Sequence, residues 1–423
     1  MGKKTLACIL AAVLTAAAIP SDACTSVIVS GRKTADGRPL MWKNRDTDSL
    51  DNSIRHFCGE RYRFIGLVNS SSPGGEVWAG INTAGFAIMN TASYCLNDDD
   101  VPPEMMDKEG ILMYRALEIC GSLEDFEHFL DTLPRPLCVE ANFGCIDALG
   151  GAAWYEAGNY TYIKRDVNES PCGYDVVTNF SWSGDKSGWK GVERWQTASA
   201  VFREMDSRGE LSGIHPLDII DSLSRSYRHE VIGIDLVRDS SSFLSATHAV
   251  VPDLDFIPRK STSAAVVIHG TASGGDPSGA VLWAALGYPS VAVTVPVPVS
   301  ACNHVPEALS CYPESGTDTF CGLSLYLKLY VFPEPEVSNS GKYARLRLVL
   351  GDTAYSHSTL SCCRKAESAI REAFSDIYED YVSGDISLQE YLDAYDEAAS
   401  GFMNCYEAAF GDYIRWRGPL SVK

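Results

Sequence analysis

The sequence has few positive charges, and past its first residues it has no long apolar segment. It carries 35 Lys and Arg against 55 Asp and Glu, a formal net charge of −20. Such an excess of negative charge argues against nucleic acid and anionic lipid surfaces as partners. After Ile19, no apolar run approaches the ~20 residues that a membrane helix needs. We therefore expect no nucleic-acid partner and no membrane span beyond the N-terminal segment.

Metal-binding and serine-hydrolase motifs are also missing. The eight histidines show neither H-E-x-x-H nor clustered ligand spacing, and there is no C-x-x-C pair, so we expect no metal and no cofactor. The stretch 268–275 contains His-Gly, which can form an oxyanion hole. G-x-S-x-G is absent, however, and a Gly/Ser-rich hairpin loop explains this stretch more simply. Cys138 and Cys145 lack the local signature of a papain-like nucleophile.

What the sequence does have is a cysteine at a cleavage junction. A basic start precedes an apolar stretch over residues 6–19, and the small residues Ser21 and Ala23 follow. This pattern predicts a secretory signal peptide over residues 1–23, and hence a secreted or periplasmic protein. A cut after Ala23 would leave Cys24 first, with its thiol beside a free α-amine. An α-amine has a pKa of about 7.7–8.0, so near neutral pH it can accept the thiol proton.

Three other interpretations of Cys24 stay open at this point. It could be an accidental cysteine at the junction, a lipid anchor, or half of a disulfide. Ser21-Asp22-Ala23 is a poor lipoprotein signal, and lipidation would block the thiol. The chain has 14 cysteines, 12 of them besides Cys8 and Cys24. In an oxidising compartment these twelve could form up to six disulfides, or they could stay buried and reduced. If they pair, Cys24 is the natural thiol to be left over.

The rest of the chain predicts one continuous α/β unit without an internal repeat or linker. Thr25–Val29 and Pro39–Lys43, joined by an Asp-Gly turn, predict a hairpin that brings residue 24 beside residues 43–46. Further strands are expected at 62–69, 77–82, 86–90, 145–149, 152–156, 160–165, 174–178, 264–268, 281–285 and 291–295. Helices are expected at 113–120, 123–133, 191–205, 217–227 and, with a break at 383–385, over 365–410. This order suits two sheets between helix layers.

Several polar residues could serve a thiol nucleophile at position 24. Attack on an amide needs a base, donors for the oxyanion, and charges that hold the amine and the substrate. Lys43, Arg45 and Asp46, at the end of the predicted hairpin, supply two cations and a carboxylate. Asn90 and Asn179 each place an amide at the end of an apolar strand. A solvated loop or an ordinary turn residue is the alternative for each.

Together these segments resemble the cysteine branch of the N-terminal nucleophile hydrolases. These are the linear-amide hydrolases that include choloylglycine hydrolases, penicillin V acylases and isopenicillin-N acyltransferase-like peptidases. The resemblance spans roughly residues 24–300. It rests on the following segments: Cys24-Thr25-Ser26, the hairpin ending Trp42-Lys43-Asn44-Arg45-Asp46, Asn90 after residues 85–89, and Thr178-Asn179 with Glu193-Arg194-Trp195 further on.

The resemblance implies an α+β fold, the four-layer αββα sandwich of the Ntn-hydrolase type with a helical C-terminal segment. It implies a single domain over residues 24–423, in which 305–423 is a C-terminal extension without a match. Cys24 would be the nucleophile with its own amine as base, and Asp46 would hold that amine.

The resemblance also implies roles for other residues. Asn90 and Asn179 fall where the family places oxyanion and amine contacts, and Arg194 falls where bile-salt hydrolases carry a supporting arginine. Lys43 stands where those enzymes have Arg. Lys cannot form the planar bidentate fork, so Lys43 and Arg45 are expected to share substrate binding.

The expected function is a secreted cysteine amidohydrolase that cleaves linear amides through an acyl-enzyme on Cys24. Its substrate would be a small N-acyl amide or peptide: an N-acyl amino acid, a conjugated bile acid or a β-lactam side chain. One alternative is an acyltransferase that uses the same acyl-enzyme. Another is a non-catalytic, disulfide-rich binding protein that is secreted or lipid-anchored. The oligomeric state, a homo-oligomer included, is left open.

Overall fold

The computed structural model describes most of the chain after the predicted signal segment. It covers residues 23–415 apart from 73, 98, 241–243, 245–249, 254, 311–316, 333–342 and 352–357. Residues 1–22, and with them nearly all of the predicted signal peptide, lie outside the described residues.

A six-stranded antiparallel sheet contains the strand that follows Cys24. Its order is β10-β1-β2-β14-β15-β16. The strands are β1 (Thr25–Val29), β2 (Leu40–Asp46), β10 (Tyr174–Val177), β14 (Thr262–His269), β15 (Val281–Leu286) and β16 (Thr294–Pro298). β1 and β2 form the predicted hairpin, with Ser26 opposite Lys43 and Thr25 opposite Asn44. All residues of β1 and β2 are buried, since both faces of this sheet are covered.

The second sheet is a seven-stranded antiparallel meander whose strands follow one another in chain order. Its strands are β3 (Asn52–Cys58), β4 (Arg63–Asn69), β5 (Ala79–Asn82), β6 (Ala87–Ala92), β7 (Ala141–Ile146), β8 (Ala152–Ala157) and β9 (Tyr162–Asp166). Two short ribbons lie outside both sheets: β11 (Arg228–His229) with β12 (Ile234–Asp235), and β13 (Val250–Pro252) with β17 (Tyr343–Arg345).

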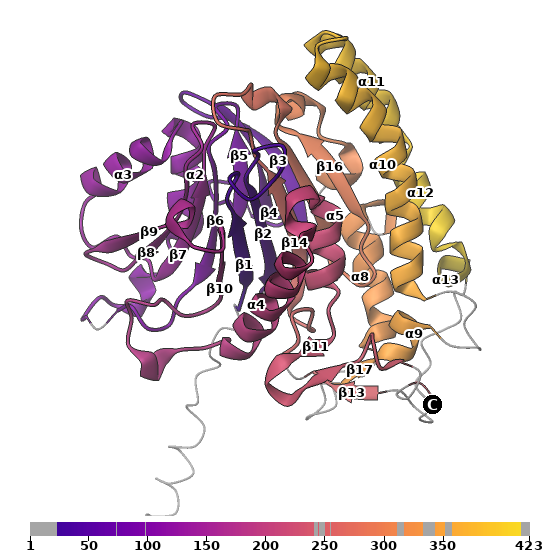
Figure 1. Cartoon of the computed structure of the whole chain (residues 1–423), viewed down its shortest axis with the longest axis horizontal. Helices are drawn as coiled ribbons and strands as arrows, with labels where there is room; N and C mark the ends of the chain where they lie inside the picture. The colour runs from indigo at the N-terminus through magenta and orange to yellow at the C-terminus, as the bar shows by residue number, and fades with distance from the viewer. Residues whose placement is uncertain are drawn as a thin grey trace, which may run out of the picture.

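Helices cover the outer face of each sheet, so the molecule has four layers (Figure 1). α2 (Glu109–Ile119) and α3 (Leu123–Thr132) pack on the seven-stranded sheet. The other helix layer consists of α4 (Val192–Ser207), α5 (Pro216–Ile219), α8 (Phe320–Val331), α10 (Thr359–Ser383), α11 (Leu388–Ser400) and α12 (Phe402–Ala409). Of the shorter helices, α9 (Leu346–Leu350) and α13 (Gly411–Arg415) contact helices of this layer, and α7 (Glu307–Ser310) contacts both α8 and β3 of the seven-stranded sheet. The predicted αββα sandwich is confirmed.

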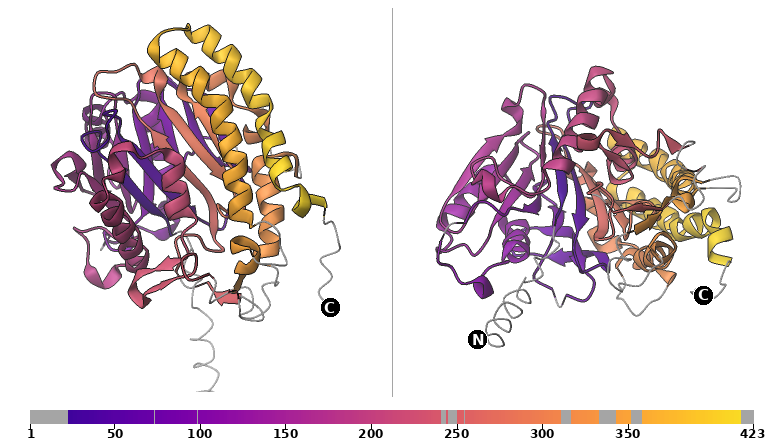
Figure 2. Two further views of the ribbon diagram at one scale, coloured as in Figure 1. Left: turned by 45° about the vertical axis from the view of Figure 1, so that its right-hand side comes forward. Right: turned by 90° about the horizontal axis from the view of Figure 1, so that it is seen from below.

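Two hydrophobic clusters hold these layers together. The larger fills the space between the sheets and continues under the C-terminal helices, where Phe374, Tyr395 and Tyr406 are buried. The smaller lies between the seven-stranded sheet and α2 and α3, around Phe126 and Phe143. Figure 2 shows the long C-terminal helices lying across the outer side of the six-stranded sheet. Among the described residues, no helix is long and apolar enough to cross a membrane.

The structure corrects several predicted boundaries. The strand expected at 145–149 lies at Ala141–Ile146, because residues 147–150 form a turn in which Asp147 Oδ1 accepts hydrogen bonds from the backbone of Leu149 and Gly151. The α-helix expected over 217–227 ends at Ile219 and continues as a wider turn to Ser224. β3 and α8 were not expected. The break in the C-terminal helix is confirmed at Gly384, whose φ of 82° ends α10.

Candidate active site

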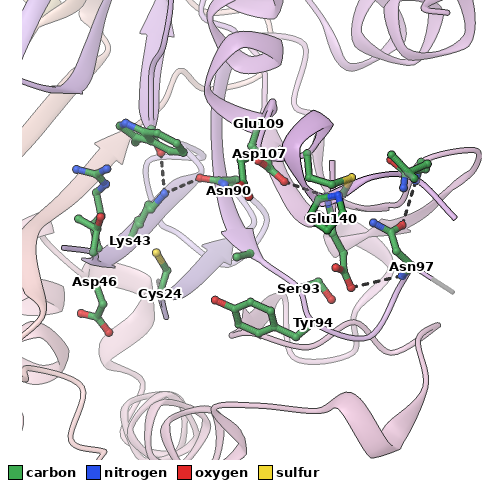
Figure 3. A pocket seen from close by; sticks show the side chains of 18 of the residues that line it. Cys24, Lys43, Asp46, Asn90, Ser93, Tyr94, Asn97, Asp107, Glu109 and Glu140 are labelled. Atoms are coloured by element: carbon green, nitrogen blue, oxygen red, sulfur yellow. Dashed lines mark hydrogen bonds between the residues drawn. The ribbon is translucent and has the colours of Figure 1, made fainter. Parts of the chain in front are cut away.

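Cys24 lies at one end of a cavity of about 500 Å³. The β1–β2 pairing brings it beside the end of β2, and Cys24 is 8% exposed. In Figure 3 its thiol points toward Lys43, while Tyr94 and Ser93 stand across the open space. The wall of the cavity comes from β2, from β6 and the loop after it, and from the segment leading into α2. It includes Cys24, Lys43, Arg45, Asp46, Trp78, Asn90, Ser93, Tyr94, Asp107, Glu109, Glu140 and Asn159.

Arg194 holds the backbone at Cys24. Its Nη1 donates to the carbonyl oxygen of Cys24 at 2.7 Å and to Oγ1 of Thr25 at 2.8 Å. Its Nη2 donates to Oδ1 of Asn179 at 2.8 Å. Nδ2 of Asn179 is in turn bound to the carbonyl oxygen of Ala92 at 2.9 Å. Arg194 is 1% exposed, so α4 places this guanidinium as an internal brace.

Arg194 and Asn179 therefore support Cys24 from outside the cavity, whereas Lys43 and Asn90 line it. Arg194 and Asn179 are both buried, and the side-chain amide of Asn179 is bound on both sides by protein groups. Asn179 fixes Arg194, and Arg194 fixes the main chain at the nucleophile.

Asp46 is held by an arginine that the sequence did not single out. Its Oδ2 accepts from Nε of Arg259 at 2.8 Å, and its Oδ1 accepts from Oγ1 of Thr262 at 2.6 Å and from Nδ2 of Asn44 at 3.1 Å. Nη2 of Arg259 donates to the carbonyl oxygen of Ala23 at 2.8 Å. The carboxylate and the peptide bond before Cys24 thus share one guanidinium.

The pKa values of Arg194 and Arg259 shift in opposite directions. Burial lowers the pKa of Arg194 to about 10, and the nearby charge of Arg259 adds to this effect while Asp46 opposes it. Burial also acts to lower the pKa of Arg259, but the adjacent Asp46 and Asp255 outweigh it and the pKa is raised. Asp46 and Asp255 are therefore the anions that stabilise this pair of cations, and Asp46 is the buried one of the two.

Lys43 is bound to protein acceptors inside the cavity wall. Its Nζ donates to Oδ1 of Asn90 at 2.7 Å and to the carbonyl oxygen of Trp78 at 2.8 Å (Figure 3). Lys43 is 1% exposed and Asn90 is 5% exposed. Since Lys43 takes the amide oxygen of Asn90, the NH₂ group of Asn90 is turned away from Lys43 and can serve as a donor.

Arg45 is likewise engaged within the protein. Its guanidinium donates to Oδ1 of Asn52, and through Nη2 to Oδ1 of Asn69 at 2.8 Å. It stacks over the Trp78 ring, with Cζ 4.9 Å from the ring centroid. Both predicted substrate-binding cations line the cavity; that they contact substrate stays a prediction.

Reasoning from the sequence missed Arg259, Thr262 and Lys328. Arg259 stands three residues before β14, which pairs with β2 so that Thr262 lies opposite Asp46. Lys328 of α8 donates from Nζ to the carbonyl oxygen of Thr262 at 3.1 Å, and burial lowers its pKa to about 8. Only the pairing of β14 with β2 relates these residues to Asp46, and no short motif marks it.

The far end of the cavity is acidic. Glu109 begins α2, and Glu140 directly precedes β7. Asp99, Asp107 and Asn159 complete this end. Burial, together with Asp107 and Glu140, raises the pKa of Glu109 to about 7, although backbone hydrogen bonds oppose the shift. In Figure 3, Asp107, Glu109 and Glu140 stand on the opposite side of the pocket from Asp46.

Two further observations concern the cysteines and metals. Each cysteine that the structure describes is a free thiol: Cys24, Cys58, Cys95, Cys120, Cys138, Cys145, Cys172, Cys321, Cys362, Cys363 and Cys405. Within the same described ranges, no group of three or more His, Cys, Asp or Glu side chains could hold a metal ion.

No family model and no curated protein matches this chain. Among solved structures, it is similar to a mutant of the conjugated bile acid hydrolase from Clostridium perfringens, at 12% identity and a TM-score of 0.37, over 65% of this chain and 92% of that one. It is similar to a penicillin V acylase from Agrobacterium tumefaciens at 14% identity and a TM-score of 0.37, over 69% and 89% of the two chains. A Caenorhabditis elegans N-acylethanolamine-hydrolyzing acid amidase ortholog matches at 15% identity and a TM-score of 0.35, over 58% and 92%. These values are low, so the interpretation of the site residues rests on the contacts described above.

Proposed function

We propose that this chain is a secreted cysteine amidohydrolase that cleaves linear amide bonds through a thioester on Cys24, the first residue once 1–23 are removed. One observation carries the proposal. Residues far apart in the sequence converge on the Cys24 thiol and its backbone: Asp46 and Lys43 from β2, Asn90 from β6, and Arg194 from α4. A buried cysteine kept only for packing does not need such charged surroundings.

The first step is attack of the Cys24 thiol on the substrate carbonyl carbon. The thiol proton passes to the free α-amine of the same residue, which is a suitable base near neutral pH. Asp46, fixed by Arg259 and Thr262, supplies the negative charge that stabilises the resulting α-ammonium.

The oxyanion of the tetrahedral intermediate needs donors that are already in place. The NH₂ group of Asn90 supplies one, because Lys43 holds the amide oxygen of Asn90 and fixes the orientation of the group. A preset donor of this kind needs no reorganisation when charge develops on the substrate oxygen.

Collapse of the intermediate breaks the C–N bond. The α-ammonium returns its proton to the leaving amine, and the acyl group remains on sulfur as a thioester. Water then attacks the thioester carbon and gives a proton to the α-amine. Loss of the thiolate, which regains that proton, frees the carboxylic acid. One amide and one water become one acid and one amine, and the enzyme is regenerated.

Removal of residues 1–23 is part of the proposal, because a peptide bond at Cys24 leaves no basic amine. While Ala23 is attached, its carbonyl oxygen accepts from Arg259 and from Nη1 of Arg194 at 3.2 Å. The precursor therefore uses these two cations to hold the bond that has to be cut.

The test compares Cys24→Ser and Cys24→Ala with the matched control Cys58→Ser, which changes an exposed thiol of β3. Hydrolysis of a panel of acyl amides should fall more than about a thousandfold in both Cys24 variants and stay unchanged in the control. Mass spectrometry should find Cys24 at the mature N-terminus and an acyl adduct on it during turnover. Unaltered hydrolysis in Cys24→Ala, or a diacylated Cys24, would contradict the proposal.

Acyl transfer to another amine would use the same thioester. Adding a nucleophilic amine during turnover and measuring the ratio of acid to new amide separates hydrolysis from transfer.

A further inference from the structure

We propose that the far end of the Cys24 cavity binds a cationic group of the substrate, an ammonium or guanidinium, so that the amides cleaved at Cys24 carry a basic group. The inference rests on the proposed function and specifies its substrate class. The cationic end of the bound substrate would lie beside Glu109 and Glu140, on the side of the cavity away from Asp46 (Figure 3).

Two carboxylates at this end form no ion pair with a lysine or arginine among the described residues, although Lys190 is near enough to Glu140 to favour its ionised form. Oε1 of Glu109 accepts from the backbone N–H of Glu140 at 2.9 Å. Oε1 of Glu140 accepts from the backbone N–H groups of Leu96 at 2.9 Å and Asn97 at 3.4 Å. Over the ranges that the structure describes, no Lys or Arg forms an ion pair with either glutamate. Asp46, by contrast, is bound to Arg259. Burying a carboxylate without a counter-charge is costly, and a cationic ligand would offset that cost.

Beside these glutamates lies an amide oxygen that has no donor among the described residues. Asn159 lines the cavity and is 1% exposed. Its Nδ2 donates to both carboxylate oxygens of Asp99 at 3.0 Å, which fixes the amide. Its Oδ1 has no hydrogen-bond partner among the described residues. This oxygen is covered in the structure, so a small rotation of the side chain would let it accept from an N–H or O–H group of a ligand and so relieve the cost of a buried acceptor without a donor.

Charge and chemistry together favour a nitrogen cation. This end of the cavity offers carboxylate and amide oxygens, and an ammonium or guanidinium is donor-only. A metal ion is the alternative cation, but the described side chains form no group that could hold one.

The acid–base state of the acids also fits this interpretation. The pKa of Glu109 is raised to about 7 by burial and by its neighbours Asp107 and Glu140. The pKa of Glu140 is raised by burial and by Asp99, while Lys190 acts in the opposite direction. A substrate cation would favour the ionised glutamates. Selectivity for it should therefore strengthen as pH rises from 6 to 8 and Glu109 loses its proton.

The experiment uses two pairs of amides. The members of each pair differ only in whether the alkyl chain ends in an ammonium group. In one pair the cation is on the acyl side of the scissile amide: the p-nitroanilides of Nα-acetyl-lysine and of Nα-acetyl-norleucine. The other carries it on the amine side, N-acetyl-cadaverine and N-acetyl-pentylamine. Binding is measured by calorimetry on the mature Cys24→Ala protein, so that the result does not depend on turnover. Hydrolysis is measured in parallel on the mature protein with Cys24 intact.

In at least one pair, the cationic member should bind about tenfold more tightly at pH 8, which corresponds to about 1.4 kcal/mol. Glu109→Gln and Glu140→Gln should each reduce that ratio toward one. Glu104→Gln is the matched control, because Glu104 is an exposed acid in the short helix next to the cavity wall and does not itself line it. The ratio should not change in this control.

The two proposals fail separately. If the neutral amides are hydrolysed through Cys24 but neither pair shows a preference, the cationic-substrate inference is overturned and the proposed function stands. A preference that survives in both Gln variants also overturns it. If binding to the Cys24→Ala protein shows the preference but no amide is cleaved, the cation site stands and the amidohydrolase proposal fails.

Discussion

The charged side chains at the two ends of the cavity have different kinds of partners. At the Cys24 end, the ionic groups of Asp46, Lys43 and Arg45 are bound by protein partners: a guanidinium, an amide and backbone carbonyls or asparagines. At the far end, Glu109 and Glu140 are bound by backbone N–H groups, without an ion pair among the described residues.

We interpret this difference as a division between groups that take part in the reaction and groups that recognise the substrate. Groups that must already be in position when the reaction begins are held rigidly, since a displacement of about 1 Å can cost a hundredfold in rate. Groups that recognise a ligand have to keep some of their bonding capacity free for it. Substitutions at each end of the cavity test this contrast.

Asp46→Asn should be the most damaging change outside the nucleophile. It removes the buried anion beside Arg259 and Arg194, so the two guanidiniums would be left with Asp255, which is 48% exposed and compensates their charge less well. We expect a loss of about 3–5 kcal/mol in the free energy of unfolding and at least about a hundredfold in kcat/KM. Urea unfolding and amide hydrolysis measure the two effects. Asp48→Asn, an exposed neighbour, is the control. Full stability of Asp46→Asn would show that this end is not held together by charge.

Lys43→Met should have a smaller effect that falls on kcat. Without the lysine, the oxygen of Asn90 loses its donor and the amide can rotate. Removing an oxyanion donor outright costs about a hundredfold or more in kcat, so loosening one should cost about tenfold. KM should stay nearly constant, because Nζ of Lys43 is bound to Asn90 and to the carbonyl oxygen of Trp78. If KM rises and kcat does not change, Lys43 binds substrate and the predicted contact is real.

Glu109→Gln should stabilise the unliganded protein at alkaline pH. A glutamate whose pKa rises from 4.5 to about 7 on folding favours the folded state while protonated. That contribution is lost as pH rises through about 7. Urea unfolding at pH 4.5 and pH 8 should therefore show the glutamine variant gaining about 1–3 kcal/mol relative to the unmodified protein at the higher pH. The opposite sign would mean that Glu109 has a cationic partner within the protein, and would remove the contrast between the two ends.

The sequence was sufficient for the hairpin and for the layers. The Asp-Gly turn that joins the first two strands is a local signal, and the hairpin that it predicts is confirmed. Residue 24 and Asp46 could be brought together because only one turn separates their strands.

Arg259 and the acidic end could not be predicted in the same way. Arg259 reaches Asp46 because β14 pairs with β2 across more than 200 residues of chain, and such long-range pairing has no local pattern. β3 was missed because its sequence, Asn-Ser-Ile-Arg-His-Phe-Cys, lacks the expected alternation. The charge environment of Glu109 depends on Glu140 and Asp107, which come from other segments, so its proton affinity follows only from the assembled fold.

Gly191 lies so close to Arg194, which holds the backbone at Cys24, that no side chain fits between them. Its φ of 73° is left-handed, and a Cβ at this position would lie 2.3 Å from Nη2 of Arg194 and 2.9 Å from its Cζ. Any side chain would strain the backbone and push the guanidinium away from the carbonyl of Cys24. A single added methyl group at the start of α4 would thus act on a residue 167 positions earlier in the chain. Sequence variation at a site that touches neither substrate nor thiol is therefore limited by the geometry of the reaction.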